Sequence, residues 1–470
     1  MHAKVIEVPC SRWHDRVAAA IDSGGRFLSL WADGGAGHAR VNLAVGHEAQ
    51  TTVLRTAATA SEVPSVVDLI PASEWDEREA HDLFGVGFAG HTPLRPLAAH
   101  PSATVEWTTP VIGEDVHQVA VGPIHAGVIE SGHFRFHVVG ERILHLDLRL
   151  FYKHRGLEDA AIGSTPEAML ALAQRACAAC AVTNTVAVAQ AYETSLGGTP
   201  GIALRRARTL LLELERLYNH LNDIGAICAG IGFAPGSMAF AGLKERAQQI
   251  NARVTGHRFL FGSITLGAST IAIDAPEARE LRTAIAEIGR DAATMWQEIR
   301  TNGSARDRLV GSGVLTPKDA ARLGTCGPAG RASGADHDAR AHSPLLWYPE
   351  FAAAGLDDPV GDVAARVQIR ARELVACCAI LDDLLSAPIT PGQIVLGDPT
   401  SDLAVGVVES PRGQTVATLE LHAGVVARLH LRTGSYANWP SLVVATTDAI
   451  LPDFPLINKS FELCYACADR

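Results

Sequence analysis

Apolar and polar residues alternate along several short stretches near the start of the chain. Alternation with a period of two is typical of half-buried strands, and it predicts strands over residues 26–32, 40–44 and 51–55. Apolar residues three and four positions apart predict a short helix over residues 17–21. Together these elements favour a small mixed α/β domain over residues 1–96.

A further helix in this domain is predicted from the residues at its ends. Ser73 is a suitable N-cap, and the acidic residues that follow it would interact with the positive end of the helix dipole. Gly85 stands where a helix commonly ends in a left-handed residue. We therefore expect a helix that begins after Ser73 and ends at Gly85.

The pattern changes in the second part of the chain, which we expect to be mainly helical. Two alternating stretches at 134–139 and 143–150 predict a hairpin, and alternation returns over residues 392–433. Apolar residues at three- and four-residue spacing predict helices over 165–193, 204–227, 243–260, 276–300, 317–323 and 360–386. The fold class is therefore α+β: the N-terminal α/β domain, a linker rich in Pro, Ala and Thr over 97–116, and a helical bundle domain with peripheral β hairpins over 117–470.

Composition narrows the function classes. The chain has 470 residues, 47% of them hydrophobic, which is ordinary for a soluble globular protein. A net charge of −11 without any basic tract argues against a nucleic-acid partner. The N-terminus lacks the apolar core of a signal peptide, and the longest uncharged runs are too short or too rich in glycine for a good spanning helix. We expect a cytoplasmic protein whose thiols stay reduced and whose membrane link, if any, runs through a partner.

Four of the nine cysteines form two Cys-x-x-Cys pairs, at Cys177 and Cys180 and at Cys464 and Cys467. A three-residue step on a helical turn directs both sulfurs to one side, and thiolates are ligands for soft transition metals. The sequence alone also allows a structural zinc site or two pairs of buried thiols, although a zinc ribbon usually separates its pairs by roughly 15–20 residues. The remaining cysteines are expected to be small buried hydrophobic residues: Cys10, Cys228, Cys326, Cys377 and Cys378.

Short motifs give the chain a resemblance to known proteins. The N-terminal part resembles the C-type subunit of bacterial complex I, through Trp75-Asp-Glu-Arg-Glu79 and Asp82-Leu-Phe-Gly85. The remainder resembles the D-type subunit of complex I and its relative, the large subunit of group 4 [NiFe] hydrogenases, through Gly122-Pro-Ile-His125, His154-Arg-Gly-Leu-Glu158 and Glu409-Ser-Pro-Arg-Gly413. The fused order of the two parts is that of formate-hydrogenlyase-type large subunits. The resemblance implies the fold of that family.

The cysteines separate these relatives. The D-type subunit of complex I lacks the four metal thiolates, whereas the hydrogenases keep both pairs. The resemblance implies that Cys177 and Cys464 are terminal nickel ligands and that Cys180 and Cys467 bridge nickel and iron. The iron would carry small diatomic ligands supplied during maturation.

Two further residues are carried over from the family as catalytic. Glu130 would transfer protons, because these hydrogenases place a glutamate shortly after a Gly-Pro-x-His motif; the alternative is an exposed acid at a strand end. Arg412 would stabilise developing charge; the alternative is a loop arginine in a surface ion pair. Structural roles are expected for a buried ion-pair network of His154, Arg155 and Glu158 and for two core histidines, His125 and His220.

The chain departs from the hydrogenase pattern at three places beside the cysteines. Ala178 replaces the usual glycine, and Glu462-Leu463 replaces the usual Asp-Pro. Asn184 replaces the usual histidine, so it can donate a hydrogen bond to sulfur but cannot carry a proton as an imidazole does.

These observations favour a catalytic large subunit of a membrane-associated [NiFe] hydrogenase that interconverts hydrogen with protons and electrons. No dinucleotide-binding, P-loop or ferredoxin-type cysteine motif is present, so the electrons would leave through a [4Fe-4S] cluster in an iron–sulfur small subunit that resembles the B-type subunit of complex I. Membrane-arm subunits would be reached through other chains. The alternatives are a complex I-like electron-transfer subunit with vestigial cysteines and a non-catalytic scaffold.

Overall fold

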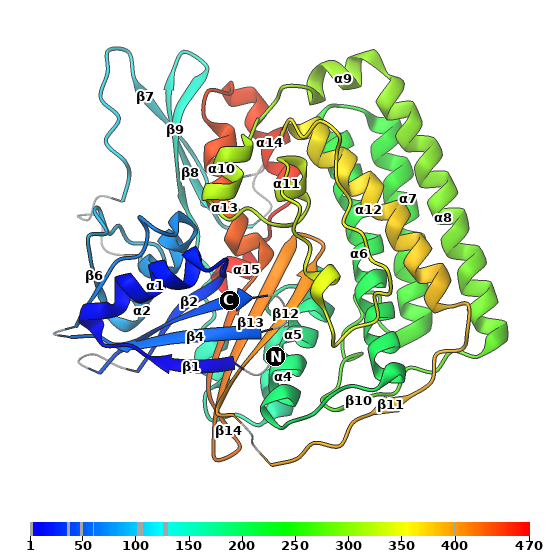
Figure 1. The fold of residues 1–470 in the computed structure, drawn as a ribbon. Coiled ribbons are helices and arrows are strands. Elements are labelled where there is room, and N and C mark those ends of the chain that lie inside the picture. The colour runs from blue at the N-terminus through cyan, green and yellow to red at the C-terminus, as the bar shows by residue number, and fades with distance from the viewer. Residues whose placement is uncertain are drawn as a thin grey trace.

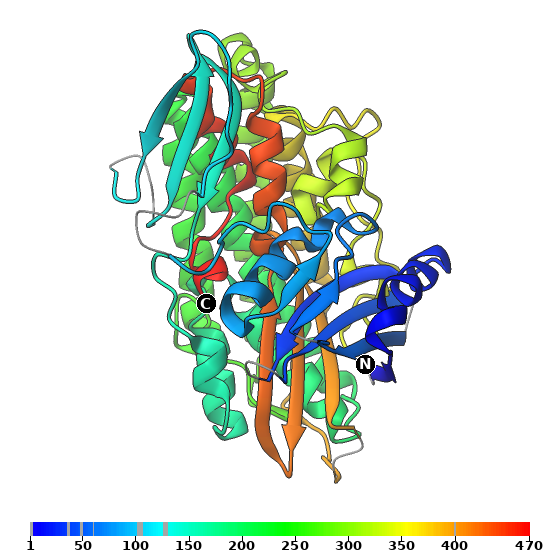
Figure 2. The ribbon, with the colours of Figure 1, turned by 90° about the vertical axis from the view of Figure 1, so that its left-hand side faces the viewer.

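A computed structural model of the protein describes residues 3–34, 38–47, 50–59, 61–100, 107–125, 130–398 and 401–470. Its elements form an N-terminal α/β unit, a central sheet and a helical bundle, which lie side by side in that order (Figure 1). A three-stranded hairpin sheet stands at one end of the molecule (Figures 1 and 2).

The N-terminal unit is a four-stranded sheet with two helices. Its strand order is β1-β4-β3-β2, with β1 parallel to β4 and the other pairs antiparallel. The elements are β1 (Ala3–Glu7), α1 (Trp13–Asp22), β2 (Arg26–Asp33), β3 (Arg40–His47), β4 (Gln50–Ala57) and α2 (Glu74–Phe84). The predicted strands and helices are confirmed; β1 was not predicted, because most of its side chains are exposed and carry no alternating pattern.

The signals at the ends of α2 are confirmed in part. Gly85 ends the helix with φ of 70°, in the left-handed region where a Cβ is unfavourable. Ser73 is the N-cap residue, but its hydroxyl does not cap the helix. It donates instead to the carbonyl of Ile70, at 2.8 Å.

Two three-stranded antiparallel sheets belong to the second part of the chain. The predicted hairpin over 134–139 and 143–150 is confirmed as part of the sheet β7 (His117–Val121), β8 (His133–Val139) and β9 (Arg142–Arg149). The alternation over 392–433 corresponds to β12 (Leu403–Ser410), β13 (Gly413–His422) and β14 (Val425–Arg432). The shorter strands are β5 (Glu62–Pro64), β6 (Gly87–Ala89), β10 (Ala268–Ser269) and β11 (Gly392–Gln393).

The sheet β12–β14 is covered on both faces. On one side Leu403, Val405 and Val416 pack against Leu28 and Trp31 of β2. Helix α5 (Ala181–Ser195) packs on the other side, and it approaches so closely that a Cβ on Gly406 would lie 1.9 Å from the carbonyl oxygen of Ala187. The central sheet therefore joins the N-terminal unit to the helical part, as Figure 2 shows.

Four long helices form the bundle, and they confirm the main helical predictions. They are α6 (Ile202–Gly230), α7 (Ala234–Thr255), α8 (Ala275–Thr301) and α12 (Val363–Leu384). The other helices are α3 (Leu157–Ala161), α4 (Pro166–Gln174), α9 (Gly303–Leu309), α10 (Pro317–Arg322), α11 (Gly327–Ala332), α13 (Gly434–Thr446), α14 (Phe454–Phe461) and α15 (Ala466–Asp469). Within the described residues, none of these helices is both long and apolar enough to cross a membrane.

One helical prediction is wrong. The single helix expected over 165–193 is two helices, α4 and α5, separated by residues 175–180. Cys177 has an extended backbone, with φ of −157° and ψ of 130°, and a short 3-10 turn follows it. The sequence gives no break signal at this point, because alanine and cysteine fit a helix as readily as a turn.

The predicted linker contains no helix or strand in its described residues, 97–100 and 107–116; positions 101–106 lie outside the described part of the chain. Its second half is nevertheless attached to the sheet, because the backbone N–H of Thr109 donates to both carboxylate oxygens of Asp147, at 3.0 Å each. The domain limits at 96 and 116 stay predictions.

Candidate metal centre

The fold brings the four paired cysteines into one cluster. Cys177 and Cys180 come from the turn between α4 and α5, and Cys464 and Cys467 come from the segment around α15. The sulfur of Cys464 lies 3.2 Å from that of Cys177, and the sulfurs of Cys177, Cys464 and Cys467 all lie within 4.8 Å of one another. Cys180 packs in the same cluster as these three residues, so all four cysteines meet.

The protons in this cluster are shared unequally. Hydrogen bonds from the thiols of Cys180, Cys464 and Cys467 hold the pKa of Cys177 well below the ordinary value of a thiol. The pKa of each of those three donors is raised well above the ordinary value, first because each hydrogen-bonds Cys177. The cluster therefore resembles one thiolate held by three thiols, and a bound metal would have to displace those protons.

A single arginine ties the two cysteine segments together. The guanidinium of Arg155 donates to the backbone carbonyls of Arg175 and Ala176, at 2.7 and 2.9 Å, and to that of Ala466, at 3.2 Å. These carbonyls flank Cys177 on one side and Cys467 on the other. Arg155 thus fixes the relative position of two segments that are far apart in the sequence.

Helix α6 packs against the turn that carries Cys177 and Cys180. The carboxylate of Glu215 accepts the backbone N–H groups of Val182 and Thr183 at the start of α5, at 2.7 and 3.1 Å, and the hydroxyl of Thr183. Burial raises the pKa of Glu215 to about 7. One turn further along α6, Asn219 donates to the carbonyl of Ala179 at 2.8 Å, and Tyr218 donates to that of Ala178 at 3.3 Å. The turn is therefore fixed by side chains of α6.

Arg412 lies in the turn between β12 and β13 and is buried. Its guanidinium donates to Asp223 Oδ1 at 2.9 Å, to the carbonyl of Glu462 at 3.1 Å, and to the side-chain oxygen of Asn219. Burial disfavours its charge, but the carboxylate of Asp223 and the sulfur of Cys180 outweigh burial and raise its pKa. A permanent cation is thus fixed beside the sulfurs, and the alternative of a surface ion pair is wrong.

Glu130 lies beside the second cysteine segment, which carries Cys464 and Cys467. Its Oε2 accepts the backbone N–H of Ala466 at 2.8 Å, at the start of α15. Burial raises the pKa of Glu130, and the nearby charge of Cys177 raises it further, while the hydrogen bond from Ala466 works against both. Glu130 is therefore a half-buried acid next to the cysteines.

The residues present fit a soft metal pair. Four thiols meet in one cluster, with a fixed cation and a carboxyl group beside it. Asn184, one helical turn after Cys180 on α5, is fully buried, and neither atom of its side-chain amide has a hydrogen-bond partner among the described residues. A buried side-chain amide is expected to have hydrogen-bond partners, so the amide of Asn184 requires a partner other than these residues. Four thiolates also suit zinc, so the donor set alone does not identify the metal.

The structure also tests the sequence predictions for two histidines, an ion-pair network and the five remaining cysteines. His220 is a core histidine as predicted, with its Nε2 2.9 Å from Glu373 Oε2, whereas His125 is exposed. Glu158 is in a buried ion-pair network, but its partners are Arg428, His430 and Arg470, and both His154 and Arg155 are exposed. Of the five remaining cysteines, Cys228 and Cys377 are buried as predicted, and Cys10, Cys326 and Cys378 are partly exposed.

Sequence reasoning missed the supporting role of α6. Glu215, Asn219 and Asp223 recur every four residues along a leucine-rich helix, so they share one face, and that face meets the cluster. This spacing of polar residues in an apolar helix was the available signal. The same spacing also occurs on solvent-exposed helix faces, and only the knowledge that most of α6 is buried could have distinguished the two cases.

Comparisons with known proteins place the chain in a family. Residues 18–110 match the family model described as the 30 Kd subunit of respiratory-chain NADH dehydrogenase, and residues 231–404 match that of the 49 Kd subunit. Hydrogenase-4 component G of Escherichia coli is 30% identical over 446 residues, covering 88% of this chain and 77% of that protein. Formate hydrogenlyase subunit 5 of the same organism is 28% identical over 442 residues, covering 87% and 77%.

A solved structure supports the fold. A chain of the membrane-bound sulfane sulfur reductase, an archaeal respiratory membrane complex, superposes with a TM-score of 0.70 at 24% identity. The match covers 77% of this chain and 100% of that chain. At this identity the similarity establishes the architecture and leaves the chemistry to the residues of the site.

Proposed function

We propose a function from the premise that this chain belongs to the family of group 4, formate-hydrogenlyase-type [NiFe] hydrogenase large subunits, in which domains like the C-type and D-type subunits of complex I are fused. Hydrogenases and NADH–quinone oxidoreductase subunits are both among its relatives, so the chain is of oxidoreductase type. The proposal is that it is the catalytic large subunit of a hydrogenase complex, which interconverts hydrogen with protons and electrons.

One observation carries this proposal: four thiols from two distant segments meet beside a buried guanidinium. Cys177, Cys180, Cys464 and Cys467 would hold a nickel–iron centre. When bound, that centre would supply a place where hydrogen is split heterolytically. A zinc site that only stabilises the fold would need neither the cation nor the acid at its side.

Two side chains would do the remaining work. Burial raises the pKa of Glu130, which favours the protonated form and suits a group that takes up and releases protons. Arg412 is held by three hydrogen bonds, so its charge is already oriented when negative charge develops in front of it, and no reorganisation is needed.

The proposal includes partners. Electrons would pass to an iron–sulfur small subunit that resembles the B-type subunit of complex I and would carry a [4Fe-4S] cluster. The complex would be attached to the cytoplasmic side of the membrane through other subunits. The names of the relatives support this: they include a membrane-bound hydrogenase and subunits of quinone reductases.

Metal analysis tests the proposal directly. The complex, co-expressed with hydrogenase maturation factors and purified without oxygen, should contain about one nickel per chain, show infrared bands of iron-bound diatomic ligands, and evolve hydrogen from a reduced viologen. Zinc at one per chain, or no metal in an assembled complex that still transfers electrons, would instead favour the electron-transfer or scaffold alternatives.

The substitution Arg412→Lys tests the role given to the guanidinium. Lysine keeps one positive charge but cannot reproduce three hydrogen bonds from a planar fork. Hydrogen turnover should fall by about 10²–10³-fold, the usual effect of removing one oriented donor, while nickel content stays unchanged. Arg290→Lys, on the exposed side of α8, is the matched control and should retain full turnover. Equal losses of nickel and turnover in Arg412→Lys would point to a purely structural role.

A further inference from the structure

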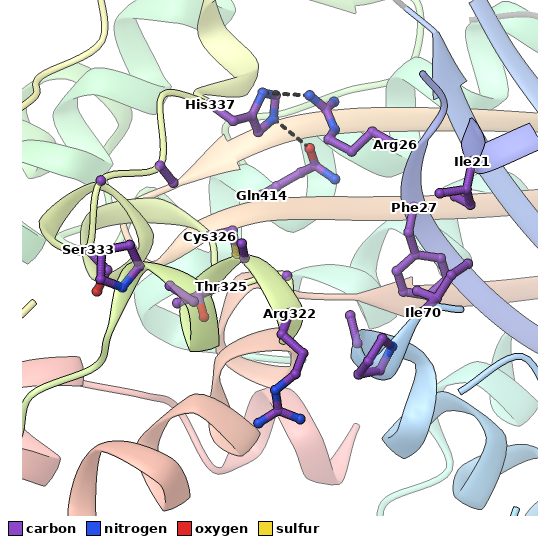
Figure 3. A pocket seen from close by; sticks show the side chains of 18 of the residues that line it. Ile21, Arg26, Phe27, Ile70, Arg322, Thr325, Cys326, Ser333, His337 and Gln414 are labelled. Atoms are coloured by element: carbon purple, nitrogen blue, oxygen red, sulfur yellow. Dashed lines mark hydrogen bonds between the residues drawn. The ribbon is translucent and has the colours of Figure 1, made fainter. Parts of the chain in front are cut away.

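A cavity lies between the N-terminal unit and the helical part. None of its lining residues belongs to the cysteine cluster. Its volume is about 490 Å³, within the range of roughly 300–1,000 Å³ typical of small-molecule sites. One wall comes from the end of α1, the start of β2 and residues 69–72, and the other from α10, residues 324–326 and residues 333–337 (Figure 3). Boundaries between domains are a common place for such sites.

Most of the lining is apolar. Phe27 and Ile70 stand on the N-terminal side of the cavity, across from Thr325 and Cys326 (Figure 3). Other apolar residues from both walls line it as well, among them Ile21, Leu69, Pro317, Ala320 and Ala335. A ligand with an apolar body would bury it here.

The charged side chains of the lining are all arginines, Arg26, Arg322 and Arg432, and it includes no aspartate or glutamate. Arg432 is already neutralised, because its Nε donates to Asp76 Oδ1 at 2.9 Å. Arg322 approaches Asp319 at 3.4 Å on the surface of α10. Arg26 differs from both: over the described ranges of the chain, no carboxylate lies within 4 Å of its guanidinium.

A histidine fixes the position of Arg26. Nη1 of Arg26 lies 2.5 Å from Nδ1 of His337, and Nε2 of His337 lies 3.0 Å from Oε1 of Gln414. The guanidinium can only donate, so Nδ1 of His337 accepts its hydrogen bond. Nε2 of His337 therefore carries the ring proton and donates a hydrogen bond to Oε1 of Gln414. Burial, with the charge of Arg26 adding to it, lowers the pKa of His337 to about 4, which keeps the imidazole neutral. Arg26 is itself exposed, and its other N–H groups are open to a ligand.

A buried hydroxyl on the opposite wall also lacks a partner. Ser333 is 1% exposed and lines the cavity, and its Oγ has no hydrogen-bond partner within the described part of the chain. A buried hydroxyl without a partner is costly, so it is expected where a ligand or water completes it. The hydroxyl gives the cavity a second polar group, on the wall opposite Arg26.

We propose that this cavity binds a small amphiphilic anion, with a carboxylate or phosphate group at Arg26 and an apolar body against Phe27 and Ile70. The ligand touches both the N-terminal unit and the helical part, so it holds them together. The site is independent of the chemistry proposed for the cysteines.

Calorimetric titration of the purified complex with three matched probes tests this site: octanoate, octyl phosphate and octan-1-ol. At least one anion should bind about tenfold or more tightly than the alcohol, as expected for a hydrogen bond to a charged group. The headgroup class follows from which anion binds better. Equal affinity for all three, or no binding at all, would overturn the proposal.

Two variants and a control localise the binding. Arg26→Gln should remove the preference for the anions over the alcohol, and Ala321→Trp, at an exposed position of the rim, should weaken all three probes by filling the cavity. Arg279→Gln removes the same charge from the exposed side of α8 and should leave every affinity unchanged. An unchanged anion affinity in Arg26→Gln would show that the anions bind elsewhere.

Discussion

Replacing Cys464 by serine is expected to abolish both nickel retention and hydrogen turnover. The sulfur of Cys464 lies 3.2 Å from that of Cys177, at the point where the two cysteine segments meet. A serine oxygen is a hard donor that soft metals bind poorly. Loss of an outer-shell partner commonly costs 10–100-fold in metal affinity, so loss of a ligand itself should cost more than about 100-fold. Nickel per chain and hydrogen evolution from reduced viologen are the measurements.

The matched control for this experiment is Cys378→Ser. Cys378 is a partly exposed cysteine on α12 that takes no part in the cluster, so its variant should keep nickel and turnover. Circular dichroism and assembly with the partner subunits show whether Cys464→Ser is folded. If the folded Cys464→Ser complex transfers electrons as the parent does, the cysteines are vestigial, and the chain is an electron-transfer subunit.

Replacing Arg331 by methionine is expected to destabilise the fold by about 3–5 kcal/mol, the usual cost of breaking a buried ion pair. Arg331 is fully buried and lies 2.7 Å from Glu373, 3.0 Å from Glu409 and 3.2 Å from Asp338. Arg331, with His220 adding to it, outweighs burial and holds the pKa of Glu373 well below its usual range. Without Arg331, Glu373 and Glu409 would lose their main counter-charge. Chemical denaturation at pH 7 measures the difference.

A surface pair provides the comparison. Arg282 lies 2.7 Å from Asp382 on the exposed side of the bundle, and Arg282→Met should leave stability nearly unchanged, because solvent screens an exposed ion pair. Because the folded-state pKa of Glu373 is lowered, its contribution is complete above its unfolded pKa of about 4.3 and is lost as the pH falls through the folded value. The gap between wild type and Arg331→Met should therefore narrow in acid. A gap that is small at pH 7 would mean that Arg216 and Arg340 already neutralise the network.

The elements that sequence patterns predicted well are those whose residues carry a clear apolar periodicity. The N-terminal strands and the hairpin β8–β9 show alternation in the sequence, and α8 carries a regular apolar face, so the positions of all of them are confirmed. The failure at 165–193 has the opposite cause. The segment between α4 and α5 mixes buried and exposed residues, and its alanines give no periodic signal that could have shown the break at the cysteines.

The buried charges were beyond prediction for a related reason. Glu213, Glu215 and Arg216 alternate with leucines, and this pattern is typical of a helix with one face in solvent. In the structure all three are fully buried: Glu213 and Arg216 form ion pairs, and Glu215 accepts backbone N–H groups at the start of α5. Which residues those partners are depends on tertiary contacts across more than a hundred positions, such as Arg340 with Glu213. A single sequence does not encode that pairing in any local pattern.

The sequence predicted the four cysteines of the candidate site, but it did not predict the groups that hold them in place. The two Cys-x-x-Cys pairs are visible in the sequence, and the structure brings them together. Arg155 was expected to join an ion-pair network, yet its guanidinium binds three backbone carbonyls that no side-chain pattern reveals. The positions of Glu130 and Arg412 beside the cysteines agree with the roles implied by the resemblance, and those roles stay proposals until the variants are measured.

The separation of the two cysteine pairs also has a consequence for biosynthesis. Cys464 follows Cys177 by 287 positions. At about 5–20 residues per second, the ribosome releases the second pair roughly 15–60 s after the first. Throughout that interval the first pair is exposed as an incomplete thiol site, open to capture by whichever thiophilic ion is most available in the cell. Under the proposed function, metal loading of this protein would therefore depend on the timing of metal delivery as much as on the selectivity of the finished cluster.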